Sequence, residues 1–445
     1  MNFRKKLSTL KVPHNKHTAG VHSICVDPPK EVLLPMTMHA GAPAVPVVAV
    51  GDYVRVGQLV ARDEGRFSCP VHATVSGTVT AIEPYQQADG TKTTIIRIES
   101  DGKMERDPNL KAPKVETLDE FLDAVKSSGI VGLGGAAFPL YGKLDALRRN
   151  KIETVLVNGA ECEPYITSDH RTMVEHSDLV VKGINVLKKY MPEAKFVISI
   201  EANKPDAIEE MKRVFADDPT VEVRELETVY PQGAKQVILY NVTGKVVKGG
   251  QRLASLGVII INVTTLSKLA QFMEDGTPLI DRCVTVDGSA IAEPKNIVVP
   301  VGTPAKYLIE QAGGLSTEPG KVLIGGPMLG HAIGSLDEPI QKATNAILAF
   351  NKKDSKLLEP SDCIHCGRCV SVCPVFLNPT AFDRAMRLEN ENERADTLER
   401  ESLNQCIECA CCSYVCPAHR PLMETNKQAK RFVRKHYAAK KEGGK

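Results

Sequence analysis

The chain has 445 residues, of which 42% are hydrophobic, and its formal net charge is +2 at pH 7. This length allows several domains, each with its own core, and the balanced charge gives no general attraction to nucleic acid or to a membrane surface. Basic residues gather at both ends, with five Lys and Arg and no acid in residues 1–20 and eight against one acid in residues 427–445. These ends are interpreted as solvated tails, with docking to an acidic partner or anionic lipid as the alternative. No apolar run reaches the length of a membrane span, and no secretory signal is recognised.

Residues 31–110 show the pattern of a small β barrel or sandwich. Short Val-rich segments alternate with turn formers such as Gly51-Asp52, Gly77 and Asp89-Gly90. The segments 51–58 and 70–79 resemble the hammerhead of lipoyl and biotinyl carrier domains, but the Met-Lys-Met hairpin that carries the prosthetic group there is missing. We therefore expect a structural barrel-sandwich module.

From residue 115 the pattern alternates between helix and strand, which predicts an α/β layer with a largely parallel sheet. Thr117-x-x-Glu120 is a capping box for the first helix. A Gly-rich loop at 132–135 follows. The remaining predicted elements are helices at 141–149, 171–190 and 205–216 and strands at 154–157, 196–200, 221–225 and 258–263.

Residues 280–335 predict a small module of β-strands and one helix. We expect strands at 283–286, 297–301 and 321–324, with the helix after Gly302-Thr303-Pro304. Residues 351–361 are polar and predict a linker. The segment 374–405 is helical in composition, and a basic helix is expected at 423–438.

Nine of the 13 cysteines lie between residues 363 and 416, which favours metal ligation in a reducing compartment over a disulfide framework. They form two runs of the pattern Cys-x2-Cys-x2-Cys-x3-Cys-Pro, the bacterial-ferredoxin pattern for a [4Fe–4S] cluster. In two-cluster ferredoxins the last cysteine of each run crosses to the other cluster. The pattern thus predicts a first cysteine set (Cys363, Cys366, Cys369 and Cys416) and a second cysteine set (Cys373, Cys406, Cys409 and Cys412). Two zinc sites are the alternative that the exact repeat disfavours; Cys411 is interpreted as a spare packed thiol and His365 as a surface residue.

The Gly-rich loop runs from Ile130 to Pro139 and contains Gly132, Gly134 and Gly135. Clustered backbone N–H groups in such a loop can bind a phosphate, and Lys143 on the next helix could neutralise it or face a flavin ring. Asn158-Gly-Ala-Glu161-Cys-Glu163-Pro-Tyr follows a strand at the sheet edge where α/β folds bind ligands, and its polar groups suit ribityl or ribose hydroxyls. A helix cap at Glu161 and a plain turn ending at Pro164 remain alternatives.

These motifs resemble the FMN- and NADH-binding subunit of respiratory complex I, and more closely the C subunit of the Rnf ion-translocating ferredoxin:NAD⁺ oxidoreductase. Further motifs of that family occur in its order between about residues 12 and 421. They are Val12-Pro13-His14-Asn15-Lys16, the stretch 39–58, Tyr230-Pro231-Gln232-Gly233, Gly325-Gly326-Pro327-Met328 and the double cysteine run. The resemblance implies a multidomain α/β protein. Its expected parts are an N-terminal segment with a barrel-sandwich hybrid (1–112), an FMN/NADH-binding α/β domain (113–275), a soluble-ligand-binding β-grasp module (276–350), an α-helical ferredoxin domain with two [4Fe–4S] clusters (351–422) and a basic tail (423–445).

The resemblance also implies binding roles for single residues. Those expected to hold FMN are Gly132, Gly134, Gly135, Lys143, Asn158, Glu161, Asn262 and Thr265, and those expected to meet the nicotinamide nucleotide are Phe138, Glu163 and Tyr230. Three positions depart from the complex I pattern: Leu133 replaces an Arg, Ala160 replaces an Asp, and Gly233-Ala234-Lys235 replaces Gly-Glu-Glu. No acid–base or nucleophilic catalytic residue is expected, since the cofactors carry the chemistry.

The function implied by the resemblance is electron exchange between NAD(H) and ferredoxin through FMN and two [4Fe–4S] clusters, coupled to ion translocation. The implied partners are the other Rnf-type subunits, including membrane-embedded ones, and a ferredoxin-type subunit, with the chain peripheral on the cytoplasmic side of the cell membrane. Two alternatives are kept: a cobalamin reductase of propanediol utilisation, and a non-catalytic iron–sulfur electron carrier. Nucleic-acid binding is disfavoured because nothing supplies an aromatic platform.

Overall fold

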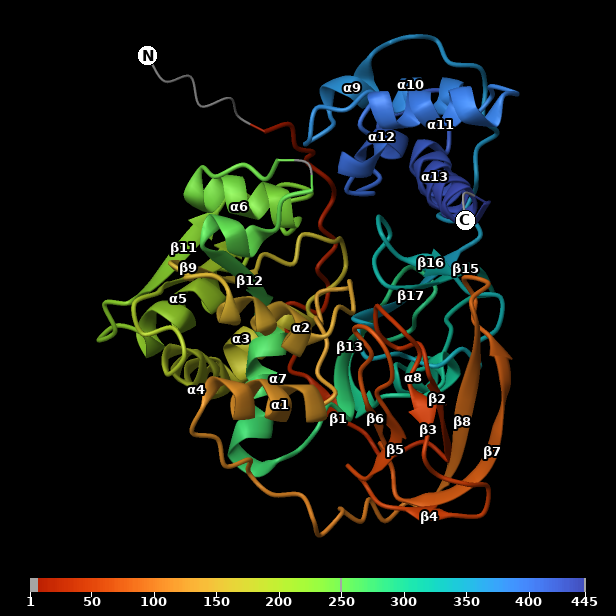
Figure 1. Ribbon diagram of the computed structural model, residues 1–445. Helices are drawn as coiled ribbons and strands as arrows, with labels where there is room; N and C mark the ends of the chain where they lie inside the picture. The colour runs from red at the N-terminus through yellow and green to blue at the C-terminus, as the bar shows by residue number, and fades with distance from the viewer. Residues whose placement is uncertain (1–6, 249, 444–445) are drawn as a thin grey trace. The chain divides into compact units, whose positions relative to one another are not determined.

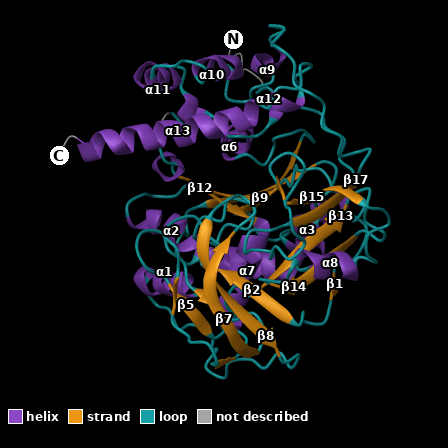
Figure 2. Cartoon of the chain, turned by 90° about the vertical axis from the view of Figure 1, so that its right-hand side faces the viewer, coloured by secondary structure: helices purple, strands orange, loops and turns teal. Residues whose placement is uncertain are grey.

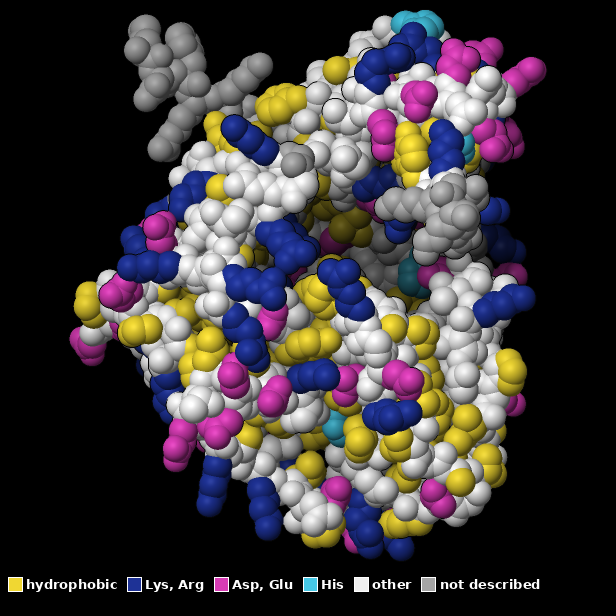
Figure 3. Space-filling model, viewed as in Figure 1, with side chains coloured by type: hydrophobic (Ala, Val, Ile, Leu, Met, Phe, Trp, Pro, Cys, Tyr) yellow, Lys and Arg dark blue, Asp and Glu magenta, His cyan; other side chains and the backbone are white. Residues whose placement is uncertain are grey.

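The computed structural model describes residues 7–248 and 250–443, which divide into two compact units (Figure 1). The larger unit comprises His14–Leu226 and Leu253–Ser355. The smaller unit comprises Glu227–Arg252 and Lys356–Lys445 together with Met1–Pro13, as far as these segments are described. Over the larger unit, Lys and Arg side chains are interspersed with Asp and Glu side chains on the face that Figure 3 shows, in keeping with the small net charge.

The first part of the larger unit is the barrel-sandwich domain expected from the turn-rich Val pattern. Two antiparallel sheets, ordered β2-β8-β7-β4 and β3-β5-β6, enclose a core that includes Val32, Val60 and Ile98. The long hairpin β7–β8 is visible in both ribbon views (Figures 1 and 2). The strands are β2 (Glu31–Pro35), β3 (Val45–Pro46), β4 (Tyr53–Val54), β5 (Leu59–Arg62), β6 (Val71–His72), β7 (Gly77–Gln86) and β8 (Lys92–Ser100).

The second part is the α/β domain, and its sheet is parallel throughout, as predicted. The strand order is β11-β10-β9-β12, so the chain moves to one side from β9 and returns to pair β12 on the other. This reversal of direction makes the space beside the carboxyl ends of β9 and β12 a topological switch point, where open α/β sheets bind ligands. The strands are β9 (Thr154–Gly159), β10 (Lys195–Glu201), β11 (Val221–Leu226) and β12 (Val258–Asn262).

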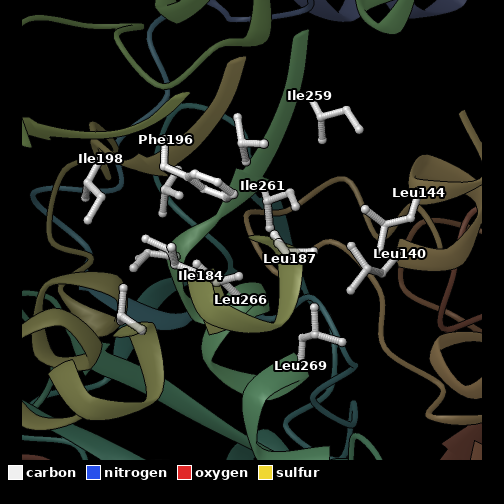
Figure 4. Packing of buried hydrophobic residues seen from close by; sticks show 14 of the residues in the cluster. Leu140, Leu144, Ile184, Leu187, Phe196, Ile198, Ile259, Ile261, Leu266 and Leu269 are labelled. Carbon is white, nitrogen blue, oxygen red and sulfur yellow. The ribbon is translucent and has the colours of Figure 1, made fainter. Parts of the chain in front are cut away.

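Helices cover this sheet and bury a continuous apolar core. Side chains from α2, α4 and α7 meet those of β10 and β12 around Phe196, Ile261 and Leu266 (Figure 4). The capping box at Thr117 is confirmed, with Glu120 accepting from the N-cap backbone in return. The helices are α1 (Leu118–Ser127), α2 (Leu140–Leu144), α3 (Ser168–Glu175), α4 (Ser177–Lys188), α5 (Pro205–Val214) and α7 (Val263–Asp275), with short 3-10 turns at Asp145–Arg148 and Leu253–Leu256.

The prediction of one long helix over 171–190 was wrong, because the structure has two helices that meet at His176. The backbone of His176 has φ −132° and ψ 39°, which is outside the helical range. Ser177 and Asp178 then start α4 as residues suited to a first helical turn, and the Ser177 hydroxyl donates to Glu210 of α5. The break therefore lets α3 and α4 pack in different directions.

The third part is the predicted module of strands and one helix, in a mixed sheet ordered β1-β14-β13-β17-β15-β16. Strand β1 comes from the N-terminal segment and pairs in parallel with β14, which joins residues 24–25 to this module. The elements are β1 (Ile24–Cys25), β13 (Asp281–Asp287), β14 (Lys295–Pro300), α8 (Ala305–Gln311), β15 (Pro319–Ile324), β16 (His331–Ala332) and β17 (Ala346–Asn351).

The smaller unit is mainly helical (Figure 2). Its core joins Phe382, Leu398 and Ala429, so the C-terminal basic helix packs against the helices between the cysteine runs. The helices are α6 (Lys235–Thr243), α9 (Arg368–Ser371), α10 (Pro379–Ala385), α11 (Glu391–Arg400), α12 (Cys411–Tyr414) and α13 (Leu422–Gly443), with a 3-10 turn at Leu403–Gln405. Among the helices of the described residues, none combines the length and the apolar character needed to cross a membrane.

Candidate functional site

The carboxyl ends of β9 and β12 carry two asparagines that lie opposite each other in the sheet register, Asn158 and Asn262. The Asn262 side chain caps α7 by accepting from the backbone N–H of Thr265 at 3.0 Å. Its amide group donates to the buried Asp169 carboxylate at 2.6 Å. Four of the predicted FMN positions therefore lie at or next to the switch point: Asn158, Glu161, Asn262 and Thr265.

The Gly-rich loop lies against the same edge. It is closed by a hydrogen bond from the backbone N–H of Gly132 to the carbonyl of Phe138 at 2.8 Å, and it is tied to α7 by Leu133 N–H donating to Thr265 Oγ1 at 2.9 Å. Gly134 is so close to Asn262 that an added Cβ would lie 3.4 Å from the Asn262 amide nitrogen. The tip from Gly134 to Ala136 is exposed, and Gly135 has a positive φ of 107° with open space around it. An exposed glycine turn beside the N-terminus of a long helix suits a phosphate group.

Phe138 and Lys143, which follow the loop, have partners in other elements. The Phe138 ring packs on Phe67 of the barrel-sandwich domain, with ring centroids 5.2 Å apart. The Lys143 ammonium group donates to the carbonyl of Ile260 in β12 at 2.6 Å, so the side chain reaches the sheet near its carboxyl edge. Gly142 lies close to the same ring, because a Cβ there would be 3.1 Å from a Phe67 ring carbon.

Glu161 caps helix α3, which was the alternative considered for it. Its carboxylate accepts from the backbone N–H groups of Asp169 at 2.6 Å and His170 at 3.2 Å. Burial is the main cause that raises its pKa, to about 7. The backbone at Glu161 is left-handed, with φ 46°, and this turns the chain sharply after β9. The capping role explains how Glu161 is fixed, and its contact with FMN stays a prediction.

The side chains of two lysines, the half-buried Lys16 and the buried Lys204, hold the backbone of this loop. Lys16 donates to the carbonyls of Glu161 and Glu163, both at 2.8 Å, and to that of Ile166. Lys204 donates to the carbonyl of Ala160 at 2.6 Å and to the Glu201 carboxylate at 3.2 Å. Burial lowers the pKa of Lys16 to about 8, opposed by the nearby Glu161 carboxylate.

A third lysine, the buried Lys342, joins the three parts of the larger unit. Its ammonium group donates to the carbonyl of Pro70 at 2.6 Å and to that of Gly129 at 2.8 Å, just before the Gly-rich loop. Lys342 is 1% exposed, and burial lowers its pKa. Lys16 belongs to a motif that carried the family resemblance, whereas Lys204 and Lys342 have no local sequence signal.

Glu163 links the loop after β9 to the Gly-Gly-Pro-Met turn of the β-grasp module. Its Oε2 accepts from the backbone N–H of Met328 at 3.1 Å, while Oε1 is buried with no hydrogen-bond partner among the described residues. A Cβ on Gly326 would lie 2.2 Å from Oε2, so the glycine allows the Glu163 carboxylate to lie this close to the turn. Burial raises the pKa of Glu163 to about 7. Its predicted contact with a nicotinamide nucleotide stays a prediction.

Among the residues expected to bind FMN or the nicotinamide nucleotide, Tyr230 alone belongs to the smaller unit. It is fully buried, and its backbone pairs with Leu10 through two hydrogen bonds of 2.7 Å. Gln232 of the same motif accepts from Asn241 of α6 at 2.6 Å. The Tyr-Pro-Gln-Gly motif therefore has a local structural role, and the predicted nucleotide contact of Tyr230 stays a prediction.

The eight predicted cysteine ligands surround two separate cavities. The first cavity is lined by all four members of the first cysteine set, together with Arg420 and Leu422. The second is lined by all four members of the second cysteine set, together with Cys411 and Asn426. Each cavity thus takes three cysteines from one run and the last cysteine from the other, which is the crossed arrangement that the spacing predicts.

The two runs also share backbone conformation. His365 and Gly367 in the first run and Glu408 and Ala410 in the second have positive φ at matching positions. The same is true of the third residue after each final cysteine, Phe376 and His419. Alternating left- and right-handed residues turn successive N–H groups toward one point, as an anionic cluster requires.

Each cysteine set lines the wall of its own cavity. Within the described residues, no group of three or more His, Cys, Asp or Glu side chains is arranged to hold a single metal ion. A cubane takes one thiolate at each of its four iron atoms, and each cavity is lined by one set of four cysteines, which is the number required. His365 is exposed, as predicted, and Cys411 is buried beside the second cysteine set.

Comparison with known proteins assigns a family model to each part. Residues 7–103 match the RnfC barrel sandwich hybrid domain, and residues 125–271 match the Nuo51 FMN-binding domain. Residues 283–332 match the SLBB domain, and residues 359–437 match the 4Fe-4S dicluster domain. The expected barrel-sandwich, FMN-binding, β-grasp and two-cluster parts are therefore confirmed as to kind and order.

Two solved structures of NAD⁺-reducing [NiFe]-hydrogenase are similar over part of the chain. The air-oxidized form has a TM-score of 0.49 at 17% identity and covers 70% of this chain and 61% of that chain. The H2-reduced form has a TM-score of 0.47 at 16% identity and covers 73% and 62%.

Curated relatives share more of the sequence. The C subunit of the Na⁺-translocating ferredoxin:NAD⁺ oxidoreductase complex of Acetobacterium woodii is 43% identical over 355 residues, which is 79% of this chain and 80% of the relative. Its proton-translocating counterpart from Clostridium ljungdahlii is 41% identical over 82% of this chain and 80% of its own length. The C subunit of the ion-translocating oxidoreductase complex of Rhodobacter capsulatus is 37% identical over 79% of this chain and 69% of its own length. The chain belongs to the family formed by the C subunits of the Rnf ion-translocating ferredoxin:NAD⁺ oxidoreductases.

Proposed function

We propose that this chain transfers electrons between NAD(H) and a ferredoxin-type protein, as one subunit of an ion-translocating membrane complex. The observation that carries the proposal is the presence of two crossed cysteine sets in the same chain as a glycine loop at the switch point of a parallel sheet. A bound flavin would supply the conversion between two-electron hydride transfer and one-electron transfer to iron–sulfur clusters.

The residues of the larger unit would bind and orient the flavin. The exposed N–H groups of the Gly-rich loop and the N-terminus of α7 favour its phosphate, while Asn158 and Asn262 offer amide groups at the strand ends. Lys143, held on the Ile260 carbonyl, adds a positive charge at the same edge. Three lysines, Lys16, Lys204 and Lys342, fix the loop backbone, so the groups that would bind the flavin are positioned before a ligand arrives.

Phe138, Glu163 and Tyr230 are proposed to meet the nicotinamide nucleotide. The support for Glu163 is its position on the loop after β9 and its unpartnered buried Oε1. The proposed partners are the other Rnf-type subunits, including membrane-embedded ones, and the proposed location is the cytoplasmic side of the membrane. The named functions of the relatives from Acetobacterium woodii and Clostridium ljungdahlii support this assignment.

The test is anaerobic purification followed by analysis of iron, sulfide and flavin. We expect about eight iron atoms per chain, four for each cluster, together with FMN, and bleaching of the flavin absorbance when NADH is added. Replacing Lys143→Met should lower the FMN content while iron stays unchanged. The control Lys151→Met removes a lysine whose side chain is 75% exposed, and it should change neither the FMN content nor the iron content.

The three possible compositions separate the hypotheses. Iron with FMN and NADH-dependent bleaching supports the proposal. Iron without FMN would make the chain an iron–sulfur electron carrier, and a chain without iron would refute the role of the cysteine sets.

A further inference from the structure

Helix α13 brings two polar side chains to the second cysteine set. Asn426 and Lys430 are four residues apart, so they lie on the same face of the helix. The Asn426 amide nitrogen lies 3.5 Å from Sγ of Cys406, as a donor to that sulfur. Lys430 donates to the carbonyl of Cys406 at 2.6 Å. Both side chains therefore reach the same cysteine.

Asn426 is built into the wall of the second cavity. It is 2% exposed and lines the cavity with the cysteines. Its Oδ1 has no hydrogen-bond partner among the described residues. Burying an amide with half of its polar groups unpaired is unfavourable, so a plain packing role does not explain an asparagine here. An N–H···S bond to a negatively charged cluster ligand does explain it.

Lys430 brings a positive charge to the same place, and Glu408 partly balances it. The ammonium group forms an ion pair with the Glu408 carboxylate at 2.7 Å, and the two side chains are 17% and 32% exposed. Without Lys430, the Glu408 carboxylate would lie beside Cys409 without its cation. Lys430 and Glu408 thus contribute electrostatic potentials of opposite sign at the cavity.

The second cysteine set also receives a backbone donor, because Leu377 N–H lies 3.3 Å from Sγ of Cys373. All four of its cysteines are buried or half-buried, whereas Cys366 of the first set is exposed. The first cavity is lined by Arg420, whose guanidinium binds the Asp383 carboxylate at 2.9 Å. The two cavities thus differ in their polar surroundings despite identical spacing.

We propose that Asn426 and Lys430 raise the reduction potential of the cluster held by the second cysteine set. Reduction adds one negative charge to the cluster, and N–H···S donors and a nearby cation stabilise that added charge. The inference rests on the proposed [4Fe–4S] assignment of the two cysteine sets. Asn426 and Lys430 are thus positioning residues that act on the electron through the ligand Cys406.

The test is a redox titration of the intact, cluster-loaded protein by electron paramagnetic resonance, with mediators and dithionite as reductant. Asn426→Leu removes the donor at similar size. We expect one of the two midpoint potentials to become more negative by about 59 mV. For one electron, this shift corresponds to a change of about tenfold in the oxidised-to-reduced ratio. The other midpoint potential should stay unchanged.

Variants of the Lys430–Glu408 ion pair test the same proposal, because loss of a positive or of a negative charge should shift the midpoint potential in opposite directions. Lys430→Gln should shift that midpoint to more negative values, and Glu408→Gln should shift it to more positive values. The matched control is Lys435→Gln, which removes the same charge from an exposed position of α13 and should leave both potentials unchanged.

The outcomes are distinct. Loss of iron in the wild-type protein would refute the cluster assignment itself. Clusters present with unshifted potentials in Asn426→Leu, or shifts of equal sign in Lys430→Gln and Glu408→Gln, would overturn the inference. If Asn426→Leu fails to retain iron, the two charge variants at the rim of the cavity decide the question alone.

Discussion

Replacing Glu163→Gln should remove a pH dependence of stability from the larger unit. The Glu163 carboxyl group is buried between the loop after β9 and the turn at Gly326, and one of its oxygens is unpartnered among the described residues. Burial raises its pKa from 4.5 to about 7, so the folded protein holds this proton more tightly than the unfolded chain does.

The sign and size follow from proton linkage. Between pH 4.5 and about 7 the folded state binds more protons than the unfolded state, so stability falls as the pH rises through this window. The stabilisation that comes from this tighter proton binding is fully present below pH 4.5 and is lost above about pH 7. One pKa unit equals about 1.36 kcal/mol, so the difference amounts to about 3 kcal/mol. A glutamine does not titrate, and this part of the pH dependence disappears with it.

The assay is urea denaturation at a series of pH values from 4.5 to 8 for the wild type and the variant, with circular dichroism as the signal. The quantity compared is the change in unfolding free energy across the window, which cancels any fixed cost of the new amide. Glu209→Gln is the control, because Glu209 is exposed on α5. Parallel pH profiles for the wild type and Glu163→Gln would refute the reasoning.

Three further predictions test other parts of the structure. Lys16→Met should lower the unfolding free energy by about 3–5 kcal/mol, because three part-buried backbone carbonyls lose their donor, and urea denaturation measures this. A loss below about 1 kcal/mol would contradict the prediction. The double variant Cys363→Ser with Cys416→Ser should keep about four iron atoms, because both residues serve one cluster when the ligands cross; uncrossed ligands predict loss of both clusters. Gly183→Ala should cost about 1–3 kcal/mol in thermal unfolding, because the new Cβ would lie 2.6 Å from the Leu266 carbonyl oxygen; an unchanged midpoint would show that α4 and α7 can separate freely.

Local patterns predicted most of the elements. The capping box at Thr117 and the four sheet strands depend on spacing within a short window, and the structure confirms them. The two cavities group the cysteines as the spacing predicts, and the crossed ligation of two clusters stays a prediction. The helix break at His176 was missed because the apolar periodicity continues across it. The break depends on Ser177 meeting Glu210 of another helix, a contact that no local window contains.

The interpretation of residues 1–20 as a solvated tail was wrong for Lys16, and the burial of Lys204 and Lys342 was missed, for the same physical reason. Lys16 and Glu161 are 145 residues apart in sequence, and Lys342 and Gly129 are 213 apart. A lysine in a polar segment predicts an exposed side chain, because burying its charge is unfavourable without several acceptors. Here those acceptors are backbone carbonyls of loops, and carbonyls leave no mark in the sequence.

The structure gives a physical context to two departures from the complex I pattern. Leu133 is 1% exposed and lies in the apolar core of the α/β domain, and Ala160 is fully buried with its carbonyl bound to Lys204. An arginine or an aspartate at these positions would need its own buried partner, so a different arrangement of the surrounding side chains is required. Both departures therefore change the packing of the loops around the site. The exposed tip at Gly134–Ala136 and the amide groups at the strand ends, which would meet the flavin, are present in this chain.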